Sequence, residues 1–107
     1  MSMDTVFRAL ADKSRRRLLD RLRARNGQTL NEMCAGLDMT RQAVTKHLVI
    51  LEEANLVVTE KRGREKLHYL NPVPIHELAE RWIGKFERQR VSALTALKKH
   101  VEGDGNG

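Results

Sequence analysis

Cysteine is almost absent from this chain, which has 107 residues and a single cysteine, Cys34. A lone cysteine cannot form an intrachain disulfide, so the sequence favours a reducing compartment. Long hydrophobic runs are also missing, because the longest, residues 48–51, is far shorter than the roughly 20 residues that span a bilayer. Asp4 and Arg8 stand where a signal peptide needs an apolar stretch. We therefore expect a cytoplasmic protein with no membrane partner.

The sequence also lacks the short motifs of common catalytic and cofactor sites. Its seven glycines form neither a GxGxxG nor a GxxxxGK pattern, and no CxxC, HExxH or GxSxG motif occurs. The length supports only one small domain, since a second core would need roughly another hundred residues. We predict that the protein is not an enzyme and holds no cofactor.

Acidic residues are fewer than basic residues in this chain. The chain has 20 Lys and Arg against 14 Asp and Glu, a formal net charge of +6, and its pI is near 10. A hydrophobic content of 40% and a charged content of 32% are typical of a globular rather than a disordered protein. Because a small basic cytoplasmic domain has few common polyanionic partners, this charge favours nucleic acid as the partner.

Helix-capping residues divide the first part of the chain. Asp4 can cap a helix over residues 5–11, and Asp12 can cap a second over residues 13–25. Gly27 follows where a helix favours a left-handed residue at its end. The many basic residues between positions 12 and 25 are more typical of a solvated helix face than of a binding surface.

Two more caps predict a helix-turn-helix over about residues 30–54. Residues 29–32 form a T-x-x-E capping box, and the short helix that it starts should stop near Gly36. Thr40 can cap the next helix, residues 41–54, whose apolar side chains recur at i, i+4 and i+7: Val44, Leu48 and Leu51. Two such helices joined by a tight turn make this motif.

After Asn55 the apolar residues no longer recur at helical spacing, and the pattern becomes that of strands. Residues 56–60 and 66–70 are predicted strands, and residues 61–65 supply a basic glycine turn, so about residues 56–70 should form a β-hairpin, or wing. Pro74 fits the first turn of a last helix that keeps an apolar period to about residue 102. Residues 103–107 contain no apolar side chain and are predicted to be a disordered tail.

This order of elements predicts a mainly α fold with a small β-hairpin: a winged helix-turn-helix with additional N- and C-terminal dimerisation helices, as one domain over residues 1–102. The major groove of B-DNA admits one α-helix, and side chains near its N-terminus reach the bases. The predicted recognition-helix contacts are Thr40, Arg41, Gln42, Thr45, Lys46 and His47. The predicted wing contacts, to the minor groove or to phosphates, are Lys61, Arg62, Gly63 and Arg64.

These side chains differ in what they can contact. Arg41 can donate two hydrogen bonds to guanine, and Gln42 can pair with adenine. Both could instead be merely solvated. Thr40 is a helix cap in any interpretation, His47 borders the core stripe and could pack there, and the wing charges could serve solubility alone.

The last helix carries a wider apolar face than the small core can cover. With the first helix it predicts a dimer interface made of Val6, Phe7, Leu10, Trp82, Ile83, Phe86, Leu94 and Leu97. A two-fold dimer would read a palindromic operator in double-stranded DNA whose half-sites lie roughly 34–36 Å apart. The alternative is that this helix only covers its own monomer.

The sequence resembles the ArsR/SmtB family of bacterial dimeric repressors over about residues 5–102. The resemblance is carried by residues 7–16 (FRALADKSRR), 39–48 (MTRQAVTKHL), 51–57 (LEEANLV) and 64–70 (REKLHYL). It implies a homodimer, joined by its first and last helices, that represses transcription from its operator.

The resemblance also identifies positions where family members bind metals. The family's thiolate site uses a C-x-C pair and a third cysteine, but Thr29 and Asn31 occupy the pair's positions and only Cys34 remains. A closed site needs three or four ligands. Cys34 could be a small buried hydrophobe, or nearby arginines could make it a redox switch.

The family's second metal site is also incomplete. It uses an Asp-x-His pair and a downstream His, whereas Pro74 precedes His76 here and Glu87 occupies the downstream position. The resemblance is therefore closest to members without a metal site, and it names no effector. Two alternatives remain open: a metal- or redox-responsive regulator, and a winged helix used as a protein-interaction module, for which only Val49 offers an apolar anchor on the recognition helix.

Overall fold

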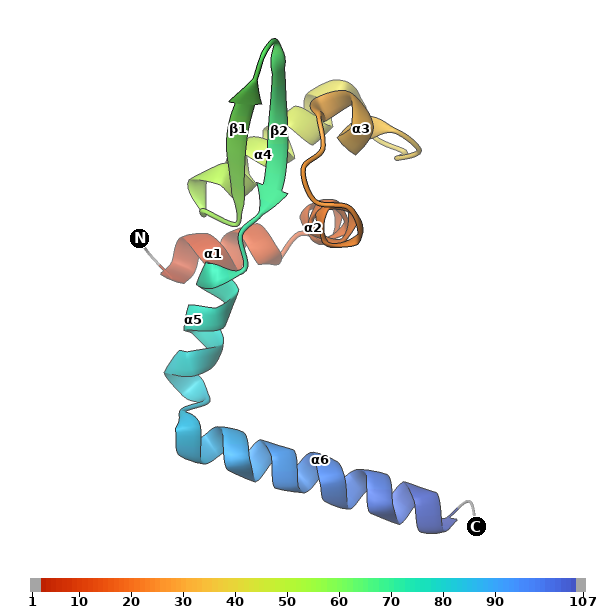
Figure 1. The fold of residues 1–107 in the computed structure, drawn as a ribbon, viewed down its shortest axis with the longest axis vertical. Coiled ribbons are helices and arrows are strands. Elements are labelled where there is room, and N and C mark those ends of the chain that lie inside the picture. The colour runs from red at the N-terminus through yellow and green to blue at the C-terminus, as the bar shows by residue number, and fades with distance from the viewer. Residues whose placement is uncertain (1–2, 106–107) are drawn as a thin grey trace. The chain divides into compact units, whose positions relative to one another are not determined.

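The computed structural model describes the backbone of residues 3–105 and the side chains of residues 3–84 and 89–101 (Figure 1). In chain order the elements are α1 (Met3–Leu10), α2 (Lys13–Ala24), α3 (Leu30–Cys34), α4 (Arg41–Glu53), β1 (Val57–Arg62), β2 (Glu65–Leu70), α5 (Val73–Trp82) and α6 (Lys85–Gly105). This mainly helical fold with one hairpin confirms the predicted class. The chain divides into two compact units, residues 1–75 and 76–107, where the sequence predicted a single domain. Within the described residues, none of these helices is both long and apolar enough to span a membrane.

Polar side chains begin three helices as the sequence predicted. The Asp12 carboxylate accepts a hydrogen bond from the backbone N–H of Arg15 (3.1 Å), and the Thr40 hydroxyl accepts one from that of Ala43 (3.0 Å). Thr29 begins α3 with both bonds of the capping box present. Each cap satisfies a backbone donor that the helix leaves unpaired, which contributes about 1 kcal/mol to stability.

The core of the first unit lies where α2, α3, α4 and the start of β1 meet. Its largest fully buried side chains are Leu18, Leu22, Met33, Val44, Leu51, Leu56 and Val57. The predicted core stripe of α4 is confirmed, because Val44, Leu48 and Leu51 are all buried. Since this stripe faces inward, the opposite face of α4 is left to solvent.

A buried polar pair joins the loop between α2 and α3 to the wing. Gln28 and His68 are each 4% exposed and form an isolated antiparallel bridge, in which His68 N donates to the Gln28 carbonyl (2.7 Å) and Gln28 N donates to the His68 carbonyl (3.0 Å). The Gln28 amide also donates to the carbonyls of Arg21 (2.9 Å) and Arg25 (2.6 Å), at the end of α2. The wing is therefore fixed to the helical part of its unit by hydrogen bonds as well as by the chain.

Gly27 permits this close approach. Its φ is +79°, the predicted left-handed conformation, and a Cβ there would lie 2.9 Å from Cε1 of Tyr69 on β2. The helix α2 ends at Ala24, however, so Gly27 lies beyond the helix end. The glycine serves the contact with β2 more than the end of the helix.

The wing has longer strands and a shorter turn than the sequence predicted. The antiparallel register runs from Val57↔Leu70 to Arg62↔Glu65, so Lys61, Arg62 and Glu65 belong to strands. The predicted five-residue turn is wrong, since residues 63–64 alone connect the strands. Gly63 has φ +64°, and two-residue hairpin turns of type II′ place glycine at this first position.

The predicted single helix over about residues 74–102 is also wrong. Two helices are present: α5 ends at Trp82 and α6 begins at Lys85, with Ile83 and Gly84 between them. Glycine is about 1 kcal/mol less favourable than alanine inside a helix, which makes Gly84 a natural place to stop. The predicted disordered tail is wrong over residues 103–105, which continue α6, and residues 106–107 lie outside the described residues.

Candidate nucleic-acid interface

The solvent face of α4 presents polar side chains along an open groove. Five of the six predicted recognition-helix residues are exposed. The groove is lined by four of them, Arg41, Gln42, Thr45 and Lys46, and Thr40 is the fifth. The Thr45 hydroxyl donates to the Arg41 carbonyl (2.9 Å), which leaves its oxygen lone pairs available as acceptors. The groove therefore combines two cations with amide and hydroxyl groups, a set that can bond both base edges and phosphates.

Arg41 reaches across to α3. Its guanidinium donates from Nη1 to Oδ1 of Asn31, a residue that the sequence analysis did not place in the site. Arg41 also lines a second groove, where the wing residues Arg64 and Lys66 come near Asn31. The first residue of α4 thus lies between the wing and the groove lined by Arg41, Gln42, Thr45 and Lys46, which we call the recognition groove after its predicted role.

His47 faces away from these side chains, toward α2. It is half-buried, and its Nδ1 lies 3.4 Å from Nη1 of Arg15, whose side chain is only 12% exposed. Arg15 in turn donates to the carbonyls of Ala9 (2.8 Å) and Arg8 (2.9 Å) at the end of α1. This placement favours the alternative in which His47 packs at the edge of the core.

Asp12 belongs to the same cluster as Arg15 and His47. The hydrogen bond from the Arg15 backbone N–H is the main reason that the pKa of the Asp12 carboxyl is lowered, and the charges of Arg15 and His47 act in the same direction. Partial desolvation opposes these effects without reversing them. Asp12 therefore stays ionised as the cap of α2 to a lower pH than a free aspartate would.

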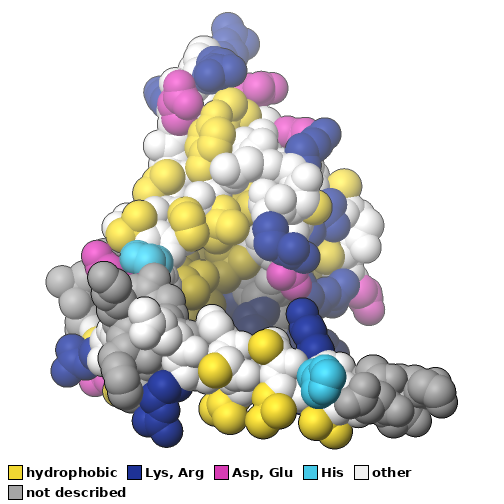
Figure 2. All heavy atoms as spheres, turned by 60° about the horizontal axis from the view of Figure 1, so that its bottom comes forward, with side chains coloured by type: hydrophobic (Ala, Val, Ile, Leu, Met, Phe, Trp, Pro, Cys, Tyr) yellow, Lys and Arg dark blue, Asp and Glu magenta, His cyan; other side chains and the backbone are white. Residues whose placement is uncertain are grey.

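The wing presents basic side chains at its tip. Lys61, Arg62 and Arg64 are exposed beside the tight turn at Gly63, and Figure 2 shows Lys and Arg side chains gathered there at the top of the view. Lys66, at the base of this basic segment, pairs with Glu52 of α4 (3.2 Å). A partly exposed pair of this kind adds little stability, but it links the strand of the wing to α4.

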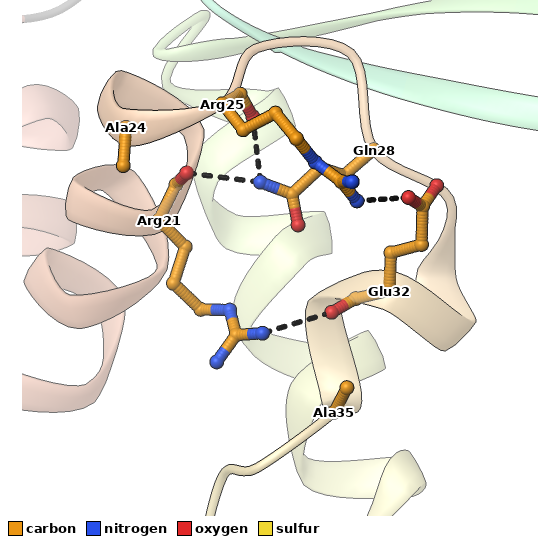
Figure 3. Close-up of a pocket in the computed structure, with 6 residues that line it drawn as sticks. All are labelled: Arg21, Ala24, Arg25, Gln28, Glu32 and Ala35. Atoms are coloured by element: carbon orange, nitrogen blue, oxygen red, sulfur yellow. Dashed lines mark hydrogen bonds and ion pairs between the residues drawn. The ribbon is translucent and has the colours of Figure 1, made fainter.

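Two arginines near the end of α2 bond to α3. Between α2 and α3 they line a pocket made of Arg21, Ala24, Arg25, Gln28, Glu32 and Ala35 (Figure 3). Arg21 donates to the Glu32 carbonyl (3.0 Å), and Arg25 pairs with the Glu32 carboxylate. The pKa of that carboxyl is lowered, chiefly by the hydrogen bond from the Thr29 backbone N–H, with partial desolvation opposing it and the Thr29 hydroxyl and Arg25 adding to it. These bonds agree with the interpretation that the basic run of α2 is not primarily a binding surface.

The predicted dimer residues differ in their exposure. Val6 is 4% exposed and belongs to the core of its own unit, whereas Phe7 is exposed and Leu10 is half-buried. Trp82, Leu94 and Leu97 are exposed, Ile83 is half-buried, and the side chain of Phe86 lies outside the described residues. Two valines that the sequence analysis left out, Val91 and Val101, extend the exposed stripe along α6, where Figure 2 shows hydrophobic side chains at the bottom of the view.

The residues of the possible metal or redox sites stay apart. Among the side chains that the structure describes, no three of the types His, Cys, Asp and Glu come together as metal ligands would. Cys34 is a half-buried free thiol on α3. Neither observation adds a ligand to the single cysteine that the sequence retains.

Comparison with known proteins agrees with this geometry. The profile of a helix-turn-helix domain family matches residues 10–60, from the end of α1 into β1. An HTH-type transcriptional regulator of Bacillus subtilis, YuzN, is 40% identical, over 75% of this chain and 94% of its own length. A solved ArsR-like transcriptional regulator from Rhodococcus sp. RHA1 is 30% identical, covers 94% of this chain and 91% of that one, and superposes with a TM-score of 0.70. A crystal structure of an ArsR family transcriptional regulator is 31% identical, over 84% of this chain and 89% of that one, with a TM-score of 0.65.

Proposed function

Since this chain belongs to the ArsR family of helix-turn-helix transcriptional regulators, we propose that it is a cytoplasmic homodimer that represses transcription by covering a palindromic operator. That it is a DNA-binding regulator and not an enzyme follows from the family itself. The proposed contact with DNA rests on one observation above all: the polar face of α4 and the basic tip of the wing are both exposed. The lone cysteine supports the cytoplasmic location.

In the proposed complex α4 lies in the major groove. Arg41 and Gln42, at its N-terminal end, face the base edges, while Lys46 contacts a phosphate. Arg62 and Arg64 contact the adjacent backbone or minor groove, where Gly63 allows close approach. A promoter held in this way is occluded for as long as the protein is bound.

Replacing Arg41 tests the proposed placement of the recognition helix. Arg41→Ala should relax the preference at one base pair of each half-site and weaken operator binding by about 1–3 kcal/mol, since a bidentate base contact is lost. Gln42→Ala should act at a neighbouring base pair. The measurement is selection of bound duplexes from a random pool, followed by sequencing.

Arg23→Ala is the matched control, because Arg23 is an exposed arginine of α2 outside the groove and the wing. It should select the same palindrome as the unaltered protein. If the Arg41 and Gln42 variants also select that palindrome unchanged, the base-reading role of α4 is refuted.

The homodimer is proposed to form through α1 and α6. The stripe of α6 supports this, because its four exposed apolar side chains follow one another at intervals of three or four residues: Val91, Leu94, Leu97 and Val101. Phe7 adds an exposed aromatic ring on α1. A row of this kind on a two-fold symmetric protein can pair with its own copy.

Leu94→Asp should weaken self-association by about a hundredfold or more, because each dimer carries two copies of the substitution. Leu94 is 63% exposed in the single chain, and burial of a leucine side chain contributes about 1.5–3 kcal/mol that a carboxylate cannot provide. Sedimentation equilibrium measures the dissociation constant directly. Ser92→Asp places the same charge on the side of α6 away from these apolar residues and should leave the constant unchanged. Equal constants for all three proteins would exclude α6 from the interface.

A further inference from the structure

The contact between Asn31 and Arg41 connects the two helices of the helix-turn-helix at the point where DNA is proposed to bind. The guanidinium of Arg41 donates to Oδ1 of Asn31, and both side chains are exposed at the protein surface. We propose that Asn31 is a positioning residue for Arg41, which holds the guanidinium ready for a guanine and thereby sets base preference. This inference rests on the proposed function, and it adds a residue of α3 to the determinants of specificity.

The backbone of Asn31 is held firmly enough to orient a partner. It is the second residue of a helix whose capping box, between Thr29 and Glu32, has both of its bonds. The Asn31 carbonyl accepts from the N–H of Ala35 (3.2 Å), and the neighbouring Glu32 carbonyl accepts from Arg21 of α2 (3.0 Å). A side chain of two torsions on such a support can fix the longer and more flexible arginine.

The chemistry of the pair leaves Arg41 able to read a base. A guanidinium has five N–H donors, of which the Asn31 oxygen takes one, and two suffice for the O6 and N7 atoms of guanine. Asparagine is neutral, so it orients the arginine without cancelling its charge. An aspartate at position 31 would bind Arg41 more strongly but would bring a negative charge toward the DNA backbone.

The surroundings of the pair favour DNA over an internal structural role. Asn31 and Arg41 line the same groove as Arg64 and Lys66 of the wing, with Glu65 as its acidic member. In the hairpin register Glu65 stands opposite Arg62. Arg41 and Arg64 thus meet at one open groove, with Lys66 beside them paired to Glu52, and two such guanidinium groups suit the edge of a polyanion.

A double-mutant cycle tests whether Asn31 acts through Arg41. Asn31→Ala should reduce discrimination at the base pair that Arg41 reads by about two- to tenfold, the effect expected when one flexible side chain must be ordered on binding. In the Arg41→Ala background the same change should have no further effect, because its partner is gone. The readouts are binding constants for the selected operator and for duplexes changed at that base pair.

Gln89→Ala is the control for loss of an exposed helical amide, and it should leave every binding constant unchanged. Equal discrimination by Asn31→Ala and the unaltered protein would overturn the inference, as would additive losses in the double variant, which would mean that Asn31 contacts DNA itself. Both results leave the proposed function intact. If the unaltered protein shows no sequence preference, the proposed function fails and this inference fails with it.

Discussion

Raising the salt concentration from 50 to 200 mM should weaken operator binding by this protein by about 10³–10⁵-fold. Each Lys or Arg that neutralises a phosphate releases a condensed counterion, and that release becomes less favourable as salt is added. Five exposed cations of each chain belong to the recognition groove or the wing tip: Arg41, Lys46, Lys61, Arg62 and Arg64. Two protomers that use most of them reach the range of about 6–10 phosphate contacts on which this estimate depends.

The structure also indicates which cations should not contribute. Arg15 and Arg21 are half-buried and donate to backbone carbonyls, and Arg25 pairs with Glu32, so the steepness of the salt dependence should fall below what 20 Lys and Arg would allow. Arg64→Ala should lower the slope of log K against log salt by about one for each protomer. Fluorescence anisotropy with a labelled operator measures this slope.

Arg23→Ala again serves as the control, since its side chain is 78% exposed on α2 and lies outside both proposed contact surfaces. Its slope should match that of the unaltered protein. A slope near zero for the unaltered protein would mean that phosphate contacts do not hold the complex together. Equal losses for Arg23→Ala and Arg64→Ala would mean that the wing has no special role.

Local signals in the sequence were enough to predict the helix-turn-helix. Each cap, at Asp12, Thr29 and Thr40, bonds a backbone N–H three residues later, and the core stripe of α4 spans seven residues. Neither signal depends on distant parts of the chain. The exposed face of α4 then follows, because a helix that buries one stripe must expose the other. For this reason the exposure of the predicted side chains of α4 could be predicted almost completely, with His47 as the exception, whereas their contact with DNA stays a prediction.

His47 shows why the edge of a helical stripe is difficult to assign. It lies beside Leu48, and position alone allowed either face. The structure places its ring near Arg15, which is 32 residues away in sequence and is itself held by carbonyls at the end of α1. That arrangement depends on how α2 crosses α4, which no local pattern encodes.

The contacts that link distant segments could not be predicted for the same reason. The bridge between Gln28 and His68 joins positions 40 residues apart, and the bond between Asn31 and Arg41 depends on the angle between two short helices. Gly27 was the one sequence signal near the bridge between Gln28 and His68, but a glycine after a helix is explained more simply as the residue that ends the helix. The break at Gly84 was missed because apolar residues on both sides keep the helical period through it.

Leu51→Ala should lower the free energy of unfolding by about 2–5 kcal/mol, the largest change in stability that we expect from one substitution in α4. Leu51 is 0% exposed, so truncation removes buried contacts and leaves a cavity. The elements that pack on α4, among them α2 and β1, contribute fully buried side chains of their own, such as Leu22, and a close-packed core of this kind collapses only in part around a void. Total stabilities of small domains are about 5–15 kcal/mol, so the loss is a large share.

Urea denaturation followed by far-ultraviolet circular dichroism measures this loss, at one protein concentration because self-association adds to apparent stability. Val49→Ala is the control on the same helix: its side chain is 45% exposed, and its effect should stay within about 0.5 kcal/mol. Equal effects of the two substitutions would contradict the inward orientation of the Leu51 stripe. Since the polar face of α4 is the side opposite that stripe, the recognition groove would then have to be placed elsewhere on the helix.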